Sequence, residues 1–343
     1  MTMTMSGVPA VRRAEPDGAS RFTPLLRRLR ARLLVTAASV RRDLEPGEDA
    51  LSGAWAAWAG DKPVGWAEVR PVLGGAPHTA WVWAGVLPEY RGQGIGSLLI
   101  GVVRDHVTQM GVERLRSGFY ADEPSALRLA EALAFIQGRT QAVSELDLSA
   151  ITVGSLNGVR PQLSRHGFEL RPLSALREQE LFDLYAAVDR DVPGDEGWRP
   201  DLAEWRRAVR NDPTTDLDLG HAATLGGRAV ALCWLQVDRE GRRGFNHLTG
   251  TRPEHRRRGL ARWLKLETAA AARKAGIRTL VTINDSRNVG MLALNERLGY
   301  RPWPLWIEVT RTLQPPSPAR HRTTSVPSPS LGSASDASLP RDR

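Results

Sequence analysis

The alternation of apolar and polar positions predicts strands and helices in an order that occurs twice along the chain. Apolar residues at every second position indicate strands, and apolar residues three or four positions apart indicate helices. In the first half we expect strands at 8–14, 54–59, 64–72, 79–87 and 114–119, helices at 20–42, 97–110 and 124–133, and a closing pair of strands that ends at 148. In the second half we expect strands at 168–172, 221–225, 229–238, 244–251 and 278–284, helices at 176–188, 201–209, 261–275 and 289–298, and strands out to 313. The predicted fold class is α/β (α+β), with a mixed, mainly antiparallel sheet flanked by helices in each half.

The two halves are related by an internal repeat with a constant spacing of 165 residues. Segment 86–96 aligns with segment 251–261, and the register holds without a gap as far as Phe135 and Tyr300. A repeat of this length is a duplicated domain and not a solenoid unit. The predicted organisation is a flexible N-terminus at 1–7, domains at 8–148 and 164–313, a linker at 149–163, and a disordered tail at 314–343 that is rich in proline and serine.

The composition is that of a globular protein, and it excludes several classes. Of the 343 residues, 41% are hydrophobic and 25% are charged, which is ordinary for a chain with a buried core. The single cysteine, Cys233, excludes a disulfide framework and a cysteine-based zinc site, and we expect no metal. The N-terminal residues lack the apolar core of a secretory signal, and no apolar run is long enough to cross a bilayer. We therefore expect a cytoplasmic protein.

The net charge of +9 does not by itself indicate a polyanionic partner. Three of the 47 basic residues are lysines, and the arginines are interspersed with acids along most of the chain, as a GC-rich coding sequence would produce. One alternative is nucleic-acid binding through the predicted helix at 20–42, which carries Arg27, Arg28, Arg30, Arg32, Arg41 and Arg42. That helix lacks the interleaved aromatic residues of single-strand binders, and packing explains its leucines. We expect no nucleic-acid partner and no membrane partner.

A glycine-rich loop stands between a predicted strand and a predicted helix in each half. In Arg91-x-x-Gly94-x-Gly96, small residues let the backbone N–H groups at a helix N-terminus approach an anion. A P-loop is excluded because neither loop contains a lysine. The dinucleotide fingerprint is excluded because Ser97 stands where that motif needs a third glycine. The loops are therefore predicted to bind the phosphate groups of another kind of ligand.

The pattern Q/R-x-x-G-x-G/A after a strand that ends in V-x-P-E-Y-R resembles the acyl-CoA pyrophosphate loop of the GNAT N-acetyltransferase superfamily. The resemblance covers residues 8–148 and 166–313. It implies two tandem GNAT folds with acetyl-CoA as the acyl-donor cosubstrate, whose pantetheine arm lies where the strand before the loop splays from the next strand. The residues that it assigns to acetyl-CoA are Val86, Leu87, Arg91, Gly92, Gln93, Gly94, Ile95, Gly96, Ser97, Thr251, Arg256, Arg257, Arg258, Gly259, Leu260, Ala261 and Asn288.

The second half resembles the family further along the chain than the first half does. Asn288 is predicted to cap the last helix and in the family approaches the pantetheine arm, whereas Glu123 stands at this position in the first half. The layout resembles mycothiol-synthase-like tandem acetyltransferases, in which the C-terminal half is catalytic. We therefore expect a first domain that is degenerate on the acceptor side and a second domain that is catalytic.

The resemblance implies direct attack of an amine on the thioester, and in many family members a tyrosine on the last helix protonates the leaving sulfur. Ala130 and Asn295 occupy that position here, and asparagine can donate a hydrogen bond but not a proton. The candidate catalytic residues are His247, Asp285 and Asn295, and the candidate contacts to a cationic substrate are Asp189 and Asp191. Two alternatives stay open, because His247 can be an ordinary strand residue and Asp285 can cap the following helix.

The predicted function is transfer of acetyl from acetyl-CoA to a primary amine, with the chemistry mainly in the second domain. The alternative is a non-catalytic acyl-CoA-binding or regulatory protein, which the missing tyrosine in both halves favours. The expected acceptor is a small-molecule amine, with a protein amine as the alternative, and the expected state is a monomer or a homodimer.

Overall fold

The computed structural model describes residues 10–45, 50–72, 74–150, 159–192 and 198–313. The predicted N-terminus at 1–7, residues 151–158 of the predicted linker and the tail at 314–343 lie outside the described residues. Within the described part of the chain, no helix has both the length and the apolar character needed to span a membrane.

The observed elements follow the predicted order, except that an unpredicted helix, Val159–Arg165, begins inside the segment 149–163 that was predicted to be a linker. In the first half they are β1 (Ala10–Arg13), α1 (Ala19–Leu29), α2 (Ala37–Leu44), β2 (Gly53–Ala59), β3 (Lys62–Pro71), β4 (Thr79–Val86), α3 (Ile95–Gln109), β5 (Arg114–Tyr120), α4 (Pro124–Ala132) and β6 (Ile136–Asp147). In the second half they are α5 (Val159–Arg165), β7 (Phe168–Pro172), α6 (Glu178–Asp189), α7 (Leu202–Trp205), β8 (His221–Leu225), β9 (Arg228–Asp238), β10 (Arg243–Thr251), α8 (Leu260–Lys274), β11 (Thr279–Asp285), α9 (Val289–Arg297), β12 (Arg301–Pro302) and β13 (Trp306–Thr312).

Two predictions for the first half are wrong. The single helix at 20–42 is two helices, because Arg30 leaves the helical conformation at φ −122° and ψ 47° and Thr36 begins a new helix. The Thr36 hydroxyl accepts a hydrogen bond from the Ser39 N–H, and Ser39 Oγ accepts one from the Thr36 N–H, each at 3.0 Å. This capping box starts α2 within a leucine pattern that would otherwise continue. The predicted pair of closing strands is one long strand, β6.

The described strands form one sheet in the order β1-β2-β3-β4-β5-β13-β6-β11-β10-β9-β8-β7, with β12 beside β6. Neighbouring strands are antiparallel except for β4–β5 and β10–β11, which are parallel. Helices cover both faces: in the first half Trp66 packs with Phe22 of α1, whereas the next residue, Ala67, packs with Leu99 of α3. In the second half α6 and α8 hold the corresponding faces. The predicted class, a mixed and mainly antiparallel sheet with flanking helices, is confirmed.

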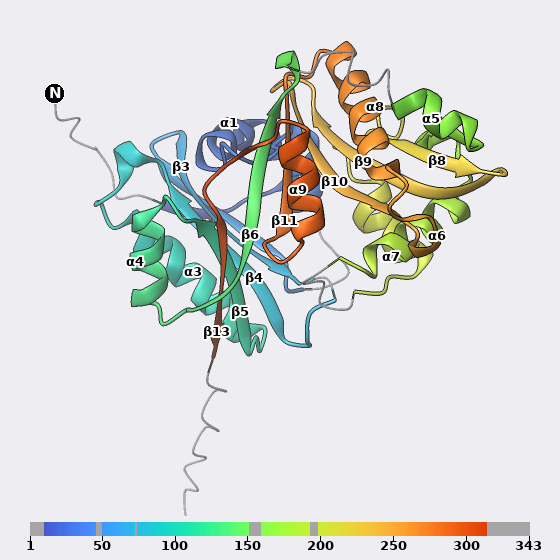
Figure 1. The fold of residues 1–343 in the computed structure, drawn as a ribbon. Coiled ribbons are helices and arrows are strands. Elements are labelled where there is room, and N and C mark those ends of the chain that lie inside the picture. The colour runs from blue at the N-terminus through green and yellow to red at the C-terminus, as the bar shows by residue number, and fades with distance from the viewer. Residues whose placement is uncertain (1–9, 46–49, 73, 151–158, 193–197, 314–343) are drawn as a thin grey trace, which may run out of the picture. The chain divides into compact units, whose positions relative to one another are not determined.

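The closing strands of the two halves are exchanged (Figure 1). β13, at the end of the second half, lies between β5 and β6 of the first half, and β6 lies between β13 and β11. The exchange is reciprocal, because Trp306 pairs with Tyr120 as Gln141, 165 residues earlier, pairs with Asp285. Trp306 and Gln141 also pair with each other, so a local two-fold axis passes between β6 and β13. The domain limits of 8–148 and 164–313 stay a prediction, and each half completes its sheet with a strand from beyond its limit.

The two parallel strand pairs separate soon after they begin. β4 pairs with β5 from Thr79 to Trp81 and then continues to Val86 without it. β10 pairs with β11 from Arg243 to Phe245 and then continues in the same way. The predicted splay is therefore present in both halves, and each opening is bordered by backbone that has no partner on that side among the described strands.

Candidate functional site

Both glycine-rich loops turn the chain from a strand into a 15-residue helix. Gly94 precedes α3 with φ 80°, and Gly259 precedes α8 with φ 83°, a left-handed conformation that favours glycine. No side chain caps either helix, so the N–H groups of the first turns have no acceptor within their own helix. A β-carbon on either glycine would meet no atom within 4 Å. Each helix N-terminus therefore offers donors and open space to an anion.

An arginine ties each loop to the strand before it. Arg91 Nε donates a hydrogen bond to the Val86 carbonyl at 3.0 Å, and Arg256 Nε donates to the Thr251 carbonyl at 3.1 Å. The same bond at the same position of the repeat shows that both loops keep one conformation.

The second loop carries more positive charge than the first. Arg257 has φ 59° where the first loop has Gly92 at φ 75°, so a cationic residue adopts the backbone conformation of a glycine. Arg258 stands where the first loop has Gln93, and the arginines of the second loop are exposed. Helix N–H groups together with guanidinium groups can hold phosphate groups.

At each opening, two consecutive backbone N–H groups at the end of the strand point in opposite directions. The N–H groups of Leu87 and Arg252 donate to β3 and β9, each at 2.9 Å. Alternate backbone groups of a strand point to opposite edges, so the N–H groups of Val86 and Thr251 point away from β3 and β9. That edge is the one from which β5 and β11 have separated.

A β-bulge marks the opening in the second half. Asn246 and Leu248 pair with consecutive residues of β9, so His247 between them is an extra residue. In the first half, β3 pairs with β4 from Gly65 to Pro71 without a register shift, so β4 has no bulge at the matching position. Because of the bulge, His247 and Leu248 both face α6 although they are consecutive. Pairing with β11 ends at Phe245, so His247 lies where the two strands separate.

His247 is half-buried among aromatic side chains. Its Nε2 lies 3.1 Å from Tyr185 Oη, and the two rings are stacked with 6.1 Å between their centroids. Tyr185 in turn packs against Trp205 and Trp234. Burial lowers the pKa of His247 below 6.5, so the imidazole is neutral at neutral pH. A neutral imidazole can accept a proton from an attacking amine.

The other two candidate catalytic residues are engaged by neighbours. Asp285 accepts hydrogen bonds from the Arg287 N–H and guanidinium at 2.8 to 2.9 Å, which lowers the pKa of Asp285 to about 2. Asn288 caps α9 as predicted, since its Oδ1 accepts from a backbone N–H three residues on at 3.2 Å. Asn295 is buried on α9, and its Nδ2 donates to Asn284 Oδ1 at 2.8 Å. Catalytic roles for Asp285 and Asn295 stay predictions.

The two candidate substrate contacts lie at the end of α6. Asp189 is the last residue of α6, and Asp191 pairs with the Arg256 guanidinium. This ion pair ties the end of α6 to the second loop, and contact of either carboxylate with a substrate stays a prediction. Among the residues that the structure describes, no group of His, Cys, Asp and Glu side chains is placed to hold a metal ion.

Sequence reasoning did not predict the surroundings of the bulge. Tyr185 contacts His247 on one face of the sheet, and a buried cluster of Asn246, Lys265, Tyr300 and Cys233 lies on the other face. The signal was present in the repeat, because Lys265 stands 165 residues after Ile100. A lysine at the position of an isoleucine in a duplicated helix indicates a difference in chemistry.

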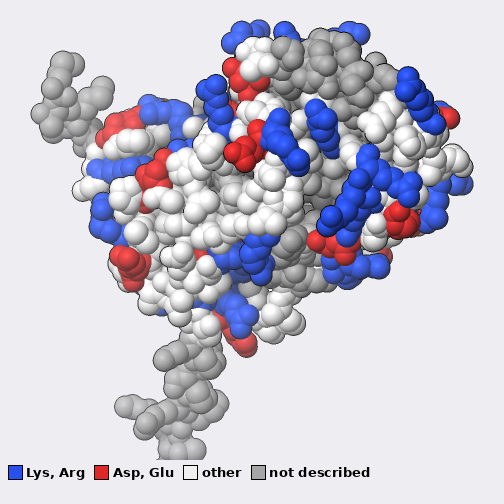
Figure 2. Space-filling view, in the orientation of Figure 1, with Lys and Arg blue, Asp and Glu red and all other residues white. Residues whose placement is uncertain are grey.

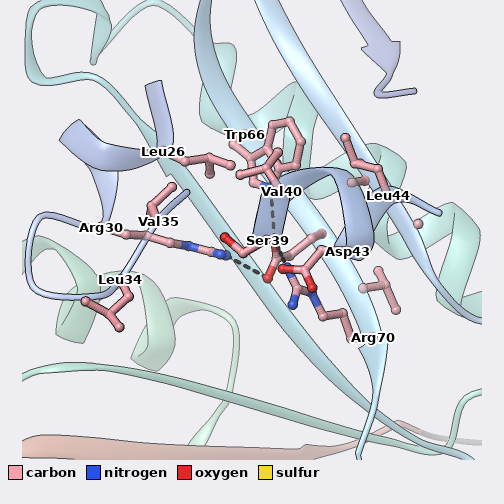
Figure 3. A pocket seen from close by; sticks show the side chains of 14 residues that line it. Leu26, Arg30, Leu34, Val35, Ser39, Val40, Asp43, Leu44, Trp66 and Arg70 are labelled. Atoms are coloured by element: carbon pink, nitrogen blue, oxygen red, sulfur yellow. Dashed lines mark hydrogen bonds and ion pairs between the residues drawn. The ribbon is translucent and has the colours of Figure 1, made fainter. Parts of the chain in front are cut away.

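The first half has a charged pocket between α1, α2 and β3 (Figure 3). Glu68 is buried there and accepts a hydrogen bond from Trp66 Nε1 at 2.9 Å. Arg30 and Arg70 approach it, at 2.6 and 3.1 Å, and Arg70 also pairs with Asp43 at 2.9 Å. Burial alone would raise the pKa of Glu68, but the two arginines lower it to about 2. The charges of this pocket are therefore compensated within the protein.

The six arginines named above in the predicted helix at 20–42 are each paired with at least one acid. The pairs are Arg27 with Asp238 and Glu240, Arg28 with Glu89, Arg30 with Glu68, Arg32 with Asp122, Arg41 with Asp17, and Arg42 with Asp43 and Asp212. On the face shown in Figure 2, several basic side chains lie beside acidic ones. Such pairs leave little of the charge that phosphate contacts along a nucleic acid need.

Comparison with known proteins agrees with this geometry. A family model described as the acetyltransferase (GNAT) family matches residues 26–135 and again residues 179–300. The chain is 27% identical over 224 residues to the mycothiol acetyltransferase of Thermobispora bispora, across 64% of this chain and 71% of that protein. It is 29% identical over 236 residues to the mycothiol acetyltransferase of Salinispora arenicola, across 66% of this chain and 71% of that protein. Its fold is similar to that of a tandem GNAT protein from the clavulanic acid biosynthesis pathway, with a TM-score of 0.67 and 18% identity over 89% of this chain and 98% of that chain. The chain belongs to the acetyltransferase (GNAT) family and carries that family's fold twice.

Proposed function

We propose that the protein is a cytoplasmic N-acetyltransferase that moves an acetyl group from acetyl-CoA to a primary amine, with the chemistry in the second half. The observation that carries this proposal is the bulge in β10, which places His247 at the opening whose strand leads into the more basic loop. The first half has an unbulged strand at the same place and a compensated ionic pocket on the same face. The proposed acceptor is a small-molecule amine, with a protein amine as the alternative.

In this proposal each group of the second site has one task. Acetyl-CoA, when bound, supplies the thioester that the amine attacks. The first-turn N–H groups of α8 and the arginines of the loop hold the phosphates, and the Thr251 N–H can donate to the thioester oxygen. His247 accepts the proton that the amine loses, and Tyr185 holds the imidazole.

A matched pair of substitutions tests which half is active. Gly96→Glu and Ala261→Glu each place a carboxylate in the first turn of a helix, where it repels a phosphate but favours the helix dipole and so leaves folding intact. We expect Ala261→Glu to lower acetyl-CoA turnover by about 100-fold or more, and Gly96→Glu to change it by less than about threefold, because like charges at a binding site oppose binding by several kcal/mol. The assay is CoA thiol release with a panel of primary amines and mass detection of acetylated products. A loss with Gly96→Glu alone would contradict the assignment.

A second function, acyl-CoA binding without turnover, is favoured by one observation. Asn295 is buried and hydrogen-bonded to Asn284, and Ala130 stands at this position in the first half, so neither α9 nor α4 offers a proton donor there. Calorimetric binding of acetyl-CoA without thiol release across the amine panel would support this function over catalysis.

A further inference from the structure

Four polar side chains meet in the core between β9, β10, α8 and the segment that follows α9. Asn246 is their centre: its Oδ1 accepts hydrogen bonds from Tyr300 Oη at 2.5 Å and from Lys265 Nζ at 3.5 Å. Its Nδ2 donates to Cys233 Sγ at 3.4 Å. Lys265 Nζ also lies 4.7 Å from the centroid of the Tyr300 ring. All four residues are buried, and we call them the polar cluster.

The first half has apolar residues at the same four positions. The register of β3 with β4 and the 165-residue repeat match Cys233, Asn246, Lys265 and Tyr300 to Ala67, Val82, Ile100 and Phe135. Of these, Ala67, Val82 and Phe135 lie in the apolar core around α3. The fold therefore forms at this place without any polar side chain, and the first half is an internal control for the second.

A lysine at this position opposes folding. Burial lowers the pKa of Lys265 to about 8, so its charged form is less favourable in the core than in water. A buried ammonium persists only where polar partners hold it. Because the same fold stands without this group in the first half, packing does not explain it.

The polar cluster lies directly beside the bulge. Asn246 faces α8 and the cluster, whereas Leu248 faces α6 and packs in the apolar core with Tyr185. His247 is the extra residue between Asn246 and Leu248, whose side chains are fixed on opposite faces of the sheet. The carbonyl of Asn246 also accepts a hydrogen bond from Thr282 Oγ1 of β11 at 3.5 Å. If the contacts of the Asn246 side chain are lost, β10 can shift by one residue into the register that β4 has. Such a shift turns each side chain before the bulge to the other face of the sheet.

We propose that Asn246, Lys265, Tyr300 and Cys233 are positioning residues that hold the bulge and thereby fix the His247 side chain at the opening of the second half. The four side chains lie on the α8 face of the sheet, opposite the face on which His247 contacts Tyr185. The effect of the bulge on the position of the His247 side chain is structural and does not depend on the function. Only the effect of that position on turnover rests on the function proposed above.

The test transplants the residues of the first half into the full chain. Asn246→Val, Lys265→Ile and Tyr300→Phe each install the residue found 164 or 165 positions earlier. Thr268→Val is the matched control, because Thr268 is also buried on α8 and also has a valine, Val103, at the repeat position, but its hydroxyl contacts His221 and not the polar cluster.

The first readout is a pH titration of the His247 ring by NMR without ligand, assigned with His247→Gln. We expect the cluster variants to shift the His247 resonance and to move its pKa toward 6.5, and Thr268→Val to leave both unchanged. The second readout separates kcat from KM: about a tenfold or greater loss of kcat is expected from the misplaced base, with the Kd for acetyl-CoA unchanged because the loop is intact.

An unchanged His247 resonance in Asn246→Val that keeps the native circular dichroism would overturn the proposal. If that variant does not fold, Tyr300→Phe decides, because it removes one hydroxyl and leaves the packing. If the cluster variants shift the His247 resonance but the wild-type protein shows no turnover with any amine, the proposed function is wrong and the positioning role stands.

Discussion

Glu68 and Lys265 are both buried and both ionisable, but their surroundings have opposite consequences. Glu68 meets two guanidinium groups, which lower its pKa to about 2 and so favour its charged form. Lys265 meets neutral groups and a ring, and burial lowers its pKa to about 8, which disfavours its charged form. The partner set, and not burial alone, therefore decides whether a core charge supports or opposes folding.

Lys265→Met should stabilise the protein in a pH-dependent way. A pKa lowered from 10.5 to about 8 corresponds to about 3 kcal/mol, at about 1.4 kcal/mol per unit. Below pH 8 the lysine is charged in both the folded and the unfolded state, so the full gain in the free energy of unfolding is expected at pH 7. The gain should fall as the pH rises from 8 and vanish near 10.5. Urea unfolding at pH 7 and pH 10 measures this, and a net loss at pH 7 would show that the hydrogen bond to Asn246 outweighs burial.

At the scale of the element, β4 and β10 are equivalent strands of the repeat, and they differ by one inserted residue. From Trp83 and Leu248 onward the residues of the two strands keep the 165-residue spacing, and His247 is the residue that β10 has in addition to those of β4. β4 shows that the strand pairs, splays and leads into its loop without the insertion. The bulge is therefore an addition to a fold that is complete without it.

Deletion of His247 should convert β10 to the register of β4 and leave the fold intact. Asn246 would still face α8 and the following residue, Leu248, would still face α6, because the alternation is restored. We expect native circular dichroism, an unchanged Kd for acetyl-CoA and about a 100-fold or greater loss of turnover, since the base and its position are both removed. His247→Gln is the matched control that keeps the bulge. Turnover of the deletion variant at the wild-type rate would contradict a role for the bulge.

At the scale of the molecule, the exchange of β6 and β13 makes each half depend on the other. Without β13, β5 and β6 would each expose an unpaired edge in the middle of the sheet. The two halves are thus one cooperative unit, although the repeat would suggest two independent ones.

Residues 1–150 expressed alone should therefore not form a folded monomer, and a chain that ends at Pro304 should not do so either, since both lack β13. Co-expression of 1–155 with 156–343 should restore a complex, because the break then falls outside every described strand. Size-exclusion chromatography and circular dichroism report the outcome, with a chain that ends at Leu313 as the control. A monomeric, folded 1–150 fragment would show that the first half can close its own sheet.

The local parts of this structure were predictable from sequence and the long-range parts were not. The loops at Gly94 and Gly259 were found because a left-handed turn before a helix restricts residue type directly. The break at Thr36 was hidden by leucines whose spacing continues across it. Periodicity indicates that 136–147 and 306–312 are strands, but it does not specify the neighbours of a strand, so the exchange was not visible. The polar cluster needed the register of β10 before Lys265 and Asn246 could be placed together.

The pairing of Trp306 with Gln141, its own counterpart in the repeat, also has a consequence for the origin of the chain. Two separate copies of a single-domain ancestor could make every one of these strand contacts across a two-fold axis, as a strand-swapped homodimer. Duplication and fusion of such a gene would join two subunits that were already interlocked. Each copy could then change independently of the other. One copy here has the bulge and Lys265 and the other has an apolar core at the same place, and a homodimer encoded by a single gene could not have this asymmetry.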